Sequence, residues 1–248
     1  MGWVLVFDLD ETLIGTTKTY KDGKYYIDDI QLNDKLFQII FHAKTLKPGL
    51  VDAILLLTNN TSVHSVYDGK EGNFLAIIES VVEDKYGMKF HKIFDNIYTG
   101  KIEEVTSGKR KTELVEYRGF GEPIYEASNI NKEFPKGKRL IKDIDTVASM
   151  LSEIGISTED LENRILFFDD ETIPHMLKEQ LERHNGKYVT IDPPFGKDKT
   201  DLKAVHAALG MNPQASALAQ AKGGGRLRGR RQRTARRKQK QRRRTKKY

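Results

Sequence analysis

The chain has 248 residues, of which 38% are hydrophobic and 31% are charged, and its formal net charge is +7. This length is sufficient for one main domain with a buried core and additional polar chain. The sequence contains no cysteine, which excludes a disulfide framework, a thiolate metal site and a cysteine nucleophile. Any catalysis must therefore use oxygen or nitrogen groups.

The positive charge is concentrated at the C-terminal end. Residues 222–248 contain 15 of the 42 Lys and Arg and none of the 35 Asp and Glu, so 27 basic and 35 acidic residues remain, a net charge of −8. The longest apolar runs, such as residues 53–57, are far shorter than the roughly 20 residues that cross a bilayer. The N-terminus also lacks the basic and apolar regions of a secretion signal. We therefore expect a soluble intracellular protein, cytoplasmic or nuclear.

The first apolar segment, Trp3–Phe7, is followed directly by the acidic cluster Asp8-Leu9-Asp10-Glu11-Thr12. Such a short run is typical of a buried parallel strand whose carboxyl end opens onto a site. Residues 16–29 then alternate polar and aromatic side chains around Asp22-Gly23, a signature of a tight hairpin turn. We expect a small β-hairpin flap here.

Helical spacing of apolar residues predicts three helices. The first follows Asn33, which suits an N-cap, and ends before Lys47-Pro48-Gly49. The second covers Phe74–Tyr86 and ends at Gly87, while the third covers residues 143–154.

Apolar runs at residues 53–57 and 165–168 predict two further buried strands, and the mixed pattern from about 94 to 135 indicates short strands. Strands separated by helices and ending in polar residues favour an α/β fold with a doubly wound parallel sheet. The candidate site is expected at the carboxyl ends of its strands.

The expected organisation is one domain over residues 1–210, with a small insertion at about 94–137, a linker over 211–225 and a basic disordered tail over 226–248. The composition of the tail cannot bury enough apolar surface to order itself. This basic tail is suited to phosphate backbones of nucleic acid or to a nuclear import receptor. It has no aromatic residue before Tyr248, which argues against base stacking.

Other roles for the basic tail stay open. It could improve solubility or rest on the acidic remainder of the chain. Arg- and Lys-rich termini of this kind also resemble those of proteins from large DNA viruses, so the chain could be a viral protein in a host cell.

Two carboxylates, Asp8 and Asp10, leave the first strand two residues apart, a spacing that lets both lie near one phosphate. An acidic turn after a strand is also typical of a solvated loop. The segment Phe7–Leu13 resembles the DxDxT signature of haloacid-dehalogenase phosphatases. Its residues DLDETL are similar to the motif of the branch that contains the RNA polymerase C-terminal-domain phosphatases. The resemblance implies that Asp8 forms an aspartyl-phosphate, that Asp10 is the general acid and base, and that Thr12 holds the loop and binds phosphate.

Two further segments fit the same family. Thr58 and Asn59 follow the second strand and would bind phosphate oxygens, with help from backbone N–H groups. Asn also suits a simple turn at this position. Lys142 lies in a segment that resembles the lysine-containing segment of the polymerase-tail phosphatases and would neutralise the phosphoryl group, although most lysines are solvated surface charges.

The last motif is Asp169-Asp170, which follows a wholly apolar strand. By resemblance, Asp170 would ligate a metal, and Asp169 would orient Lys142 or the metal's waters. Mg²⁺ suits this set because it takes a few carboxylate or carbonyl oxygens and fills its other positions with water and phosphate. The implied ligands are Asp8, the Asp10 carbonyl and Asp170, with Asp169 beside them.

The resemblance covers about residues 3–180 in outline, and residues 63–135 have no clear counterpart in it. Where the polymerase-tail branch has a tryptophan after the acidic pair, this chain has Ile173-Pro174-His175, which weighs against a phosphoprotein substrate of that branch. The leading expectation is a magnesium-dependent phosphomonoester hydrolase acting on a phosphoprotein, a nucleic-acid end or a small metabolite. The alternative is a catalytically idle adaptor of the same fold that binds nucleic acid through the basic tail.

Overall fold

The computed structural model describes residues 1–21, 24–61, 64–104, 110–116, 132–134, 142, 144–170, 178, 180–181, 183–192 and 200–211. The chain divides into two compact units, Met1–Asp201 and Leu202–Tyr248. The described part of the second unit contains one short helix, α6 (Lys203–Ala208). The predicted disordered tail and nearly all of the predicted linker lie outside the described residues.

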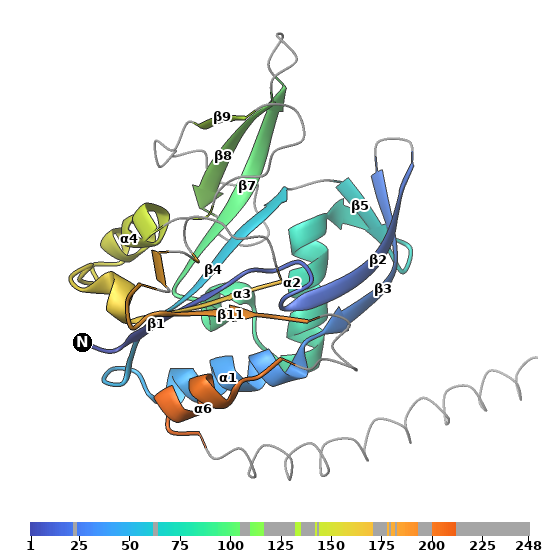
Figure 1. Ribbon diagram of the computed structural model, residues 1–248. Coiled ribbons are helices and arrows are strands. Elements are labelled where there is room, and N and C mark those ends of the chain that lie inside the picture. The colour runs from blue at the N-terminus through green and yellow to red at the C-terminus, as the bar shows by residue number, and fades with distance from the viewer. Residues whose placement is uncertain are drawn as a thin grey trace, which may run out of the picture. The chain divides into compact units, whose positions relative to one another are not determined.

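A seven-stranded sheet forms the centre of the first unit, with the strand order β11-β10-β1-β4-β7-β8-β9. The strands from β11 to β7 are parallel, while β8 and β9 pair antiparallel. An α/β fold with a parallel sheet is thus confirmed (Figure 1). The strands are β1 (Trp3–Phe7), β4 (Val51–Thr61), β7 (Asn96–Glu104), β8 (Arg110–Glu116), β9 (Lys132–Phe134), β10 (Ile165–Asp169) and β11 (Lys187–Thr190).

The strand order reverses at β1. The chain passes from β1 to β4 on one side and later returns to place β10 on the other side of β1. In open α/β sheets, ligands bind outside the carboxyl ends of the strands at such a switch point. The residues that follow β1 and β10 therefore lie where a ligand is expected to bind.

Helices cover both faces of the sheet. One buried cluster joins alternate residues of the strands, such as Val4 and Val6, to Val147, Met150 and Leu151 of α4 (Ile144–Glu153). Figure 1 shows α1 (Asp34–Thr45) on the opposite face from α4. The period-two alternation of β1 thus supplies apolar side chains to both layers. The remaining helices of this unit are α2 (Phe74–Tyr86), α3 (Phe90–Ile93) and the 3₁₀ turn Leu161–Asn163.

The predicted helices are confirmed to within a residue or two in the described chain. The Asn33 side chain accepts a hydrogen bond from the backbone N–H of Leu36, and so caps α1. Helix α2 covers the predicted residues, and Gly87 ends it with a left-handed φ of 73°. Among the described residues, no helix combines the length and the apolar character that a membrane span requires.

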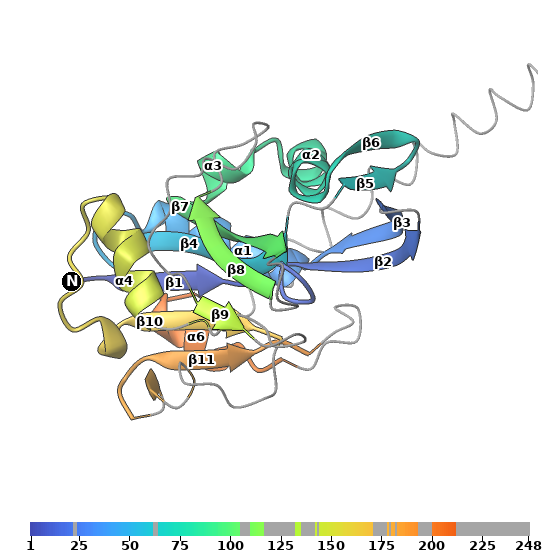
Figure 2. The same ribbon diagram turned by 90° about the horizontal axis from the view of Figure 1, so that it is seen from above.

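The predicted hairpin is confirmed as β2 (Ile14–Lys21) and β3 (Lys24–Leu32), which pair antiparallel. It belongs to a larger four-stranded sheet, in the order β2-β3-β5-β6, that the sequence pattern did not predict. We call this sheet the flap sheet; its other strands are β5 (His64–Tyr67) and β6 (Lys70–Asn73). Figures 1 and 2 both place it beyond the carboxyl end of β1.

The predicted end of the second strand was wrong. The apolar run stops at Leu57, whereas β4 continues to Thr61. Its pairing with β7 is irregular between these two residues. Backbone pairing does not require apolar side chains, so the hydrophobic pattern marked only the buried part of the strand. The short strands expected between about 94 and 135 are present as β7, β8 and β9, and they extend the central sheet.

Candidate active site

Asp8 and Asp169 lie side by side because their strands are neighbours. Phe7 of β1 pairs with Phe168 of β10, and their rings stack with centroids 4.4 Å apart. The backbone N–H of Asp8 then donates to the carbonyl of Phe168 at 2.9 Å. This register brings the first acid after β1 and the last residue of β10 to one point on the carboxyl edge.

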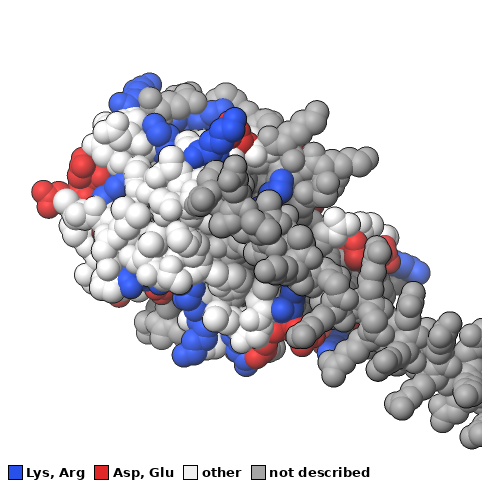
Figure 3. Space-filling view, turned by 90° about the horizontal axis from the view of Figure 1, so that it is seen from below, with Lys and Arg blue, Asp and Glu red and all other residues white. Residues whose placement is uncertain are grey.

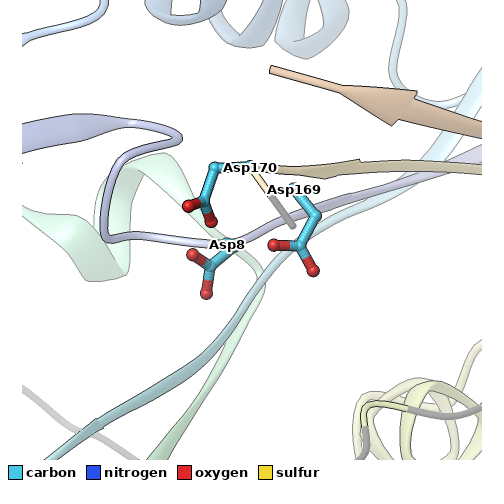
Figure 4. Close-up of side chains that lie close together, drawn as sticks. All are labelled: Asp8, Asp169 and Asp170. Atoms are coloured by element: carbon cyan, nitrogen blue, oxygen red, sulfur yellow. The ribbon is translucent and has the colours of Figure 1, made fainter. Parts of the chain in front are cut away.

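Three carboxylates gather at this point. Asp8, Asp169 and Asp170 each offer an oxygen atom, and these atoms all lie within 4.8 Å of one another. Figure 4 shows the three side chains turned toward a common space at the ends of β1 and β10. Asp8 and Asp169 are buried and Asp170 is partly buried, so the cluster is not an ordinary solvated acidic surface.

Lys142 supplies a positive charge to this cluster. Its Nζ lies 2.8 Å from Oδ1 of Asp8 and 3.1 Å from Oδ2 of Asp169, and the side chain is only 5% exposed. Burial by itself would lower the pKa of Lys142, but the two carboxylates outweigh it and raise the pKa above its usual value. Lys142 is therefore charged. The predicted contact between Asp169 and Lys142 is present, as is a contact of Lys142 with Asp8.

The single positive charge of Lys142 does not balance the three carboxylates of the cluster. Burial, followed by the charges of Asp169 and Asp10, raises the pKa of Asp8 to about 7, although Lys142 opposes the shift. Burial and the charge of Asp169 likewise raise the pKa of Asp170 to about 6. A divalent cation would relieve this repulsion, and an all-oxygen donor set is the kind that Mg²⁺ prefers. The residues present thus fit such an ion.

The loop after Asp8 is a compact turn. The backbone N–H groups of Leu13 and Ile14 both donate to the carbonyl of Leu9, at 2.9 and 3.0 Å. Glu11 adopts a left-handed φ of 55°, which is uncommon for a residue other than glycine and marks stored strain. Such strain persists only where the surroundings hold the loop in place.

Asn33 provides part of that support. Besides capping α1, its Nδ2 donates to the carbonyl of Thr12 at 3.0 Å. The sequence identified Asn33 as a cap, but a contact 21 residues away carries no local signal. Thr12 itself is fully buried, and its hydroxyl has no hydrogen-bond partner in the described structure. The contact of Thr12 with Asn33 thus uses its backbone carbonyl, and the roles of its side chain in holding the loop and binding phosphate stay predictions.

Asp10 lies at the outer side of the site. Its side chain is 35% exposed, and Oδ1 lies 3.7 Å from Nζ of Lys18 on β2 of the flap sheet. The Lys18 ammonium also lies over the rings of Phe74 and Tyr25, at 4.7 and 5.1 Å from their centroids. Sequence reasoning missed Lys18, because one lysine in an alternating hairpin looks like any exposed strand residue.

Thr58 and Asn59 belong to the same edge of the sheet. Phe7 pairs with Leu56, so Thr58 follows two residues after the partner of the last residue in β1. Thr58 is buried, while the side chain of Asn59 lies outside the described part of the structure. Both residues are inside β4 rather than after it. Their predicted phosphate contacts stay predictions.

The comparisons with known proteins give no relative for this chain. No family model matches it, and neither a curated protein nor a solved structure does so.

Proposed function

We propose that the protein is a magnesium-dependent phosphomonoester hydrolase that works through an aspartyl-phosphate on Asp8. The observation that carries the proposal is the buried contact of Asp8 with Lys142 in a cluster with Asp169 and Asp170, at the switch point of the sheet. Three clustered carboxylates with one buried lysine leave unbalanced negative charge, which is unfavourable as a purely structural arrangement. Clusters of acids with shifted pKa values, at the carboxyl edge of a sheet, are typical of catalytic sites.

In the first step, a carboxylate oxygen of Asp8 attacks phosphorus and the bond from phosphorus to the ester oxygen breaks. Asp10 gives a proton to that oxygen, so the leaving group departs as an alcohol. The partial exposure of Asp10 suits this role, because the leaving group must reach solvent. The two acids thus divide the chemistry according to their surroundings.

In the second step, Asp10 takes a proton from a water molecule whose oxygen attacks phosphorus. The bond between phosphorus and Asp8 breaks, inorganic phosphate forms, and Asp10 is again protonated. Nζ of Lys142 lies 2.8 Å from the Asp8 carboxylate, so its ammonium would lie beside a phosphoryl group carried by Asp8. There it would offset negative charge on the phosphoryl oxygens in both steps.

Asp8, Asp170 and the Asp10 carbonyl would hold the metal, with Asp169 fixing Lys142. When bound, Mg²⁺ would polarise the phosphoryl group and favour the ionised form of Asp8. Asp169, which is fully buried and 3.1 Å from Lys142, acts in this scheme by orienting that lysine.

The proposal is tested by incubating the purified full-length protein with p-nitrophenyl phosphate, phosphopeptides, phosphorylated DNA and RNA ends, nucleotides and sugar phosphates, with and without Mg²⁺. Release of phosphate should require Mg²⁺. Asp8→Asn should abolish turnover and phosphoenzyme formation, because an amide is a poor nucleophile. Asp28→Asn is the matched control, since Asp28 is an exposed residue of β3.

Substantial turnover by Asp8→Asn would exclude this mechanism. A wild-type protein that binds Mg²⁺ but hydrolyses none of these esters would instead favour the catalytically idle adaptor. The hydrolase has the stronger support, because an idle fold has no need of a buried acid held against Lys142.

A further inference from the structure

We propose that Lys18 determines substrate specificity by binding a second anionic group carried by the leaving group. The substrates would be phosphomonoesters with a carboxylate or another phosphate close to the scissile ester oxygen. This inference rests on the proposed hydrolase activity. It assigns a role to the flap sheet, which the chemistry described above does not use.

Lys18 reaches the site from a different sheet than the other charged groups. It lies on β2 of the flap sheet, and its ammonium is 3.7 Å from Asp10. Its side chain is 29% exposed, whereas that of Lys142 is 5% exposed. The two lysines therefore form an inner and an outer positive charge, and only the outer one is open to a group entering from solvent.

Two aromatic rings fix the position of the outer charge. Phe74, the first residue of α2, and Tyr25 of β3 both have their rings within about 5 Å of the ammonium, at 4.7 and 5.1 Å. Cation–π contacts at this distance hold an ammonium without neutralising it. Lys18 is thus preorganised as a positive charge that keeps its capacity for an anion.

The position of Asp10 decides which end of a substrate Lys18 meets. A general acid must lie within hydrogen-bond reach of the ester oxygen that it protonates. Because Lys18 is adjacent to Asp10, it lies next to the leaving group, while Lys142 lies next to Asp8 and the phosphoryl group.

The ion pair between Lys18 and Asp10 is long and partly open to solvent. Nζ of Lys18 lies 3.7 Å from Oδ1 of Asp10, and the Lys18 side chain is 29% exposed. An anionic group on the leaving group would bind the ammonium on this open side. A purely structural link between flap and loop would not distinguish substrates by charge.

A matched pair of small esters tests the inference. In 2-phosphoglycerate the carbon that bears the phosphate also carries a carboxylate, whereas glycerol 2-phosphate has a hydroxymethyl group there. The full-length protein should show a higher kcat/KM for 2-phosphoglycerate. Lys18→Met should reduce this preference by roughly tenfold, the range for a hydrogen bond to a partly exposed charge.

Two variants control the test. Lys18→Arg keeps the positive charge and should retain much of the preference. Lys24→Met removes another lysine of the flap sheet, one that pairs with Glu71 at 2.9 Å, and should leave the preference unchanged. Equal losses for both esters in Lys18→Met would overturn the inference, because they would show that Lys18 acts through Asp10 or through the fold.

Binding separates this inference from the hydrolase proposal. Calorimetry of the Asp8→Asn protein with Mg²⁺ and each ester reports the same preference without turnover. Tighter binding of 2-phosphoglycerate that Lys18→Met abolishes would support the role of Lys18 even if the wild-type protein hydrolysed neither ester. Equal binding of both esters with Lys18 intact would refute it, whatever the activity.

Discussion

Two pairs of a lysine and a proposed catalytic acid lie in different surroundings: Lys142 with Asp8 at the carboxyl edge of the central sheet, and Lys18 of the flap sheet with Asp10. Lys142 is buried between Asp8 and Asp169. Lys18 is partly exposed, lies 3.7 Å from Asp10, and has its ammonium over the rings of Phe74 and Tyr25. Removing one partner of a buried ion pair commonly costs about 3–5 kcal/mol, whereas an exposed pair contributes about 0.2–1 kcal/mol. The inner pair is therefore expected to be fixed, and the outer pair is able to exchange partners.

The largest effect is expected at the inner lysine. Lys142→Met would leave the buried carboxylates without their positive charge, so we expect loss of turnover and a free energy of unfolding lower by roughly 3 kcal/mol. Lys18→Met should change the free energy of unfolding by less than about 1 kcal/mol. Urea denaturation of both variants without metal measures the difference. Similar losses for the two variants would contradict the contrast between inner and outer charge.

The next effect concerns Asp10. Asp10→Asn should slow hydrolysis roughly 10²-fold to 10⁴-fold, as is usual when a general acid and base is removed. It should leave Mg²⁺ binding nearly intact, because the carboxylates proposed to hold the ion are those of Asp8 and Asp170, and Asp10 would contribute only its backbone carbonyl, which Asn retains. Steady-state kinetics and metal titration measure the two properties separately. An undiminished rate would assign the proton transfer to another group.

The affinity for Mg²⁺ should depend on pH through Asp8 and Asp170. In the metal-free protein the pKa of Asp8 is about 7 and that of Asp170 about 6, so both bind protons as pH falls from 8 to 5.5. Mg²⁺ binds the ionised carboxylates, so its affinity should weaken over this range, by about tenfold per pH unit for each proton displaced. Calorimetric titration at several pH values measures this.

In the absence of metal, the free energy of unfolding should change with pH in the direction opposite to the metal affinity. Because the folded pKa values of Asp8 and Asp170 lie above the unfolded value, the folded state holds protons that the unfolded chain has released. The free energy of unfolding should therefore decrease as pH rises from about 4 to about 7. Asp8→Asn should reduce this slope, and Asp28→Asn should not. A metal affinity independent of pH would contradict the assignment of these acids as ligands.

The central sheet was largely predictable from sequence, whereas only the β2–β3 hairpin of the flap sheet was. The strands β1 and β10 are continuous apolar runs that end at acids, so pattern and strand topology together located Asp8 and Asp169. Lys18 gave no such signal, because its partners Asp10 and Phe74 come from separate parts of the chain. Residues of β5 and β6 are mostly polar and carried no periodicity that would join them to the hairpin.

The smallest effect on hydrolysis is expected from the basic tail. Every proposed catalytic residue precedes residue 171, so a chain that lacks residues 222–248 should hydrolyse small phosphomonoesters nearly as fast as the full chain. On the face shown in Figure 3, side chains of both charge signs are interspersed over the described residues. The one long run of unbalanced positive charge in the sequence is the segment from 222 to 248.

The same truncation should weaken binding to DNA or RNA. For the full chain, the logarithm of the binding constant should fall with the logarithm of salt concentration, with a slope of about −0.9 for each duplex phosphate neutralised. A full-length variant with the 15 Lys and Arg of residues 222–248 changed to Gln keeps the length and separates charge from mere presence of the segment. It should bind as weakly as the truncated chain. Equal affinities and salt slopes for all three proteins would show that the tail serves localisation, protein contacts or solubility, and that the acidic remainder of the chain provides any nucleic-acid contact.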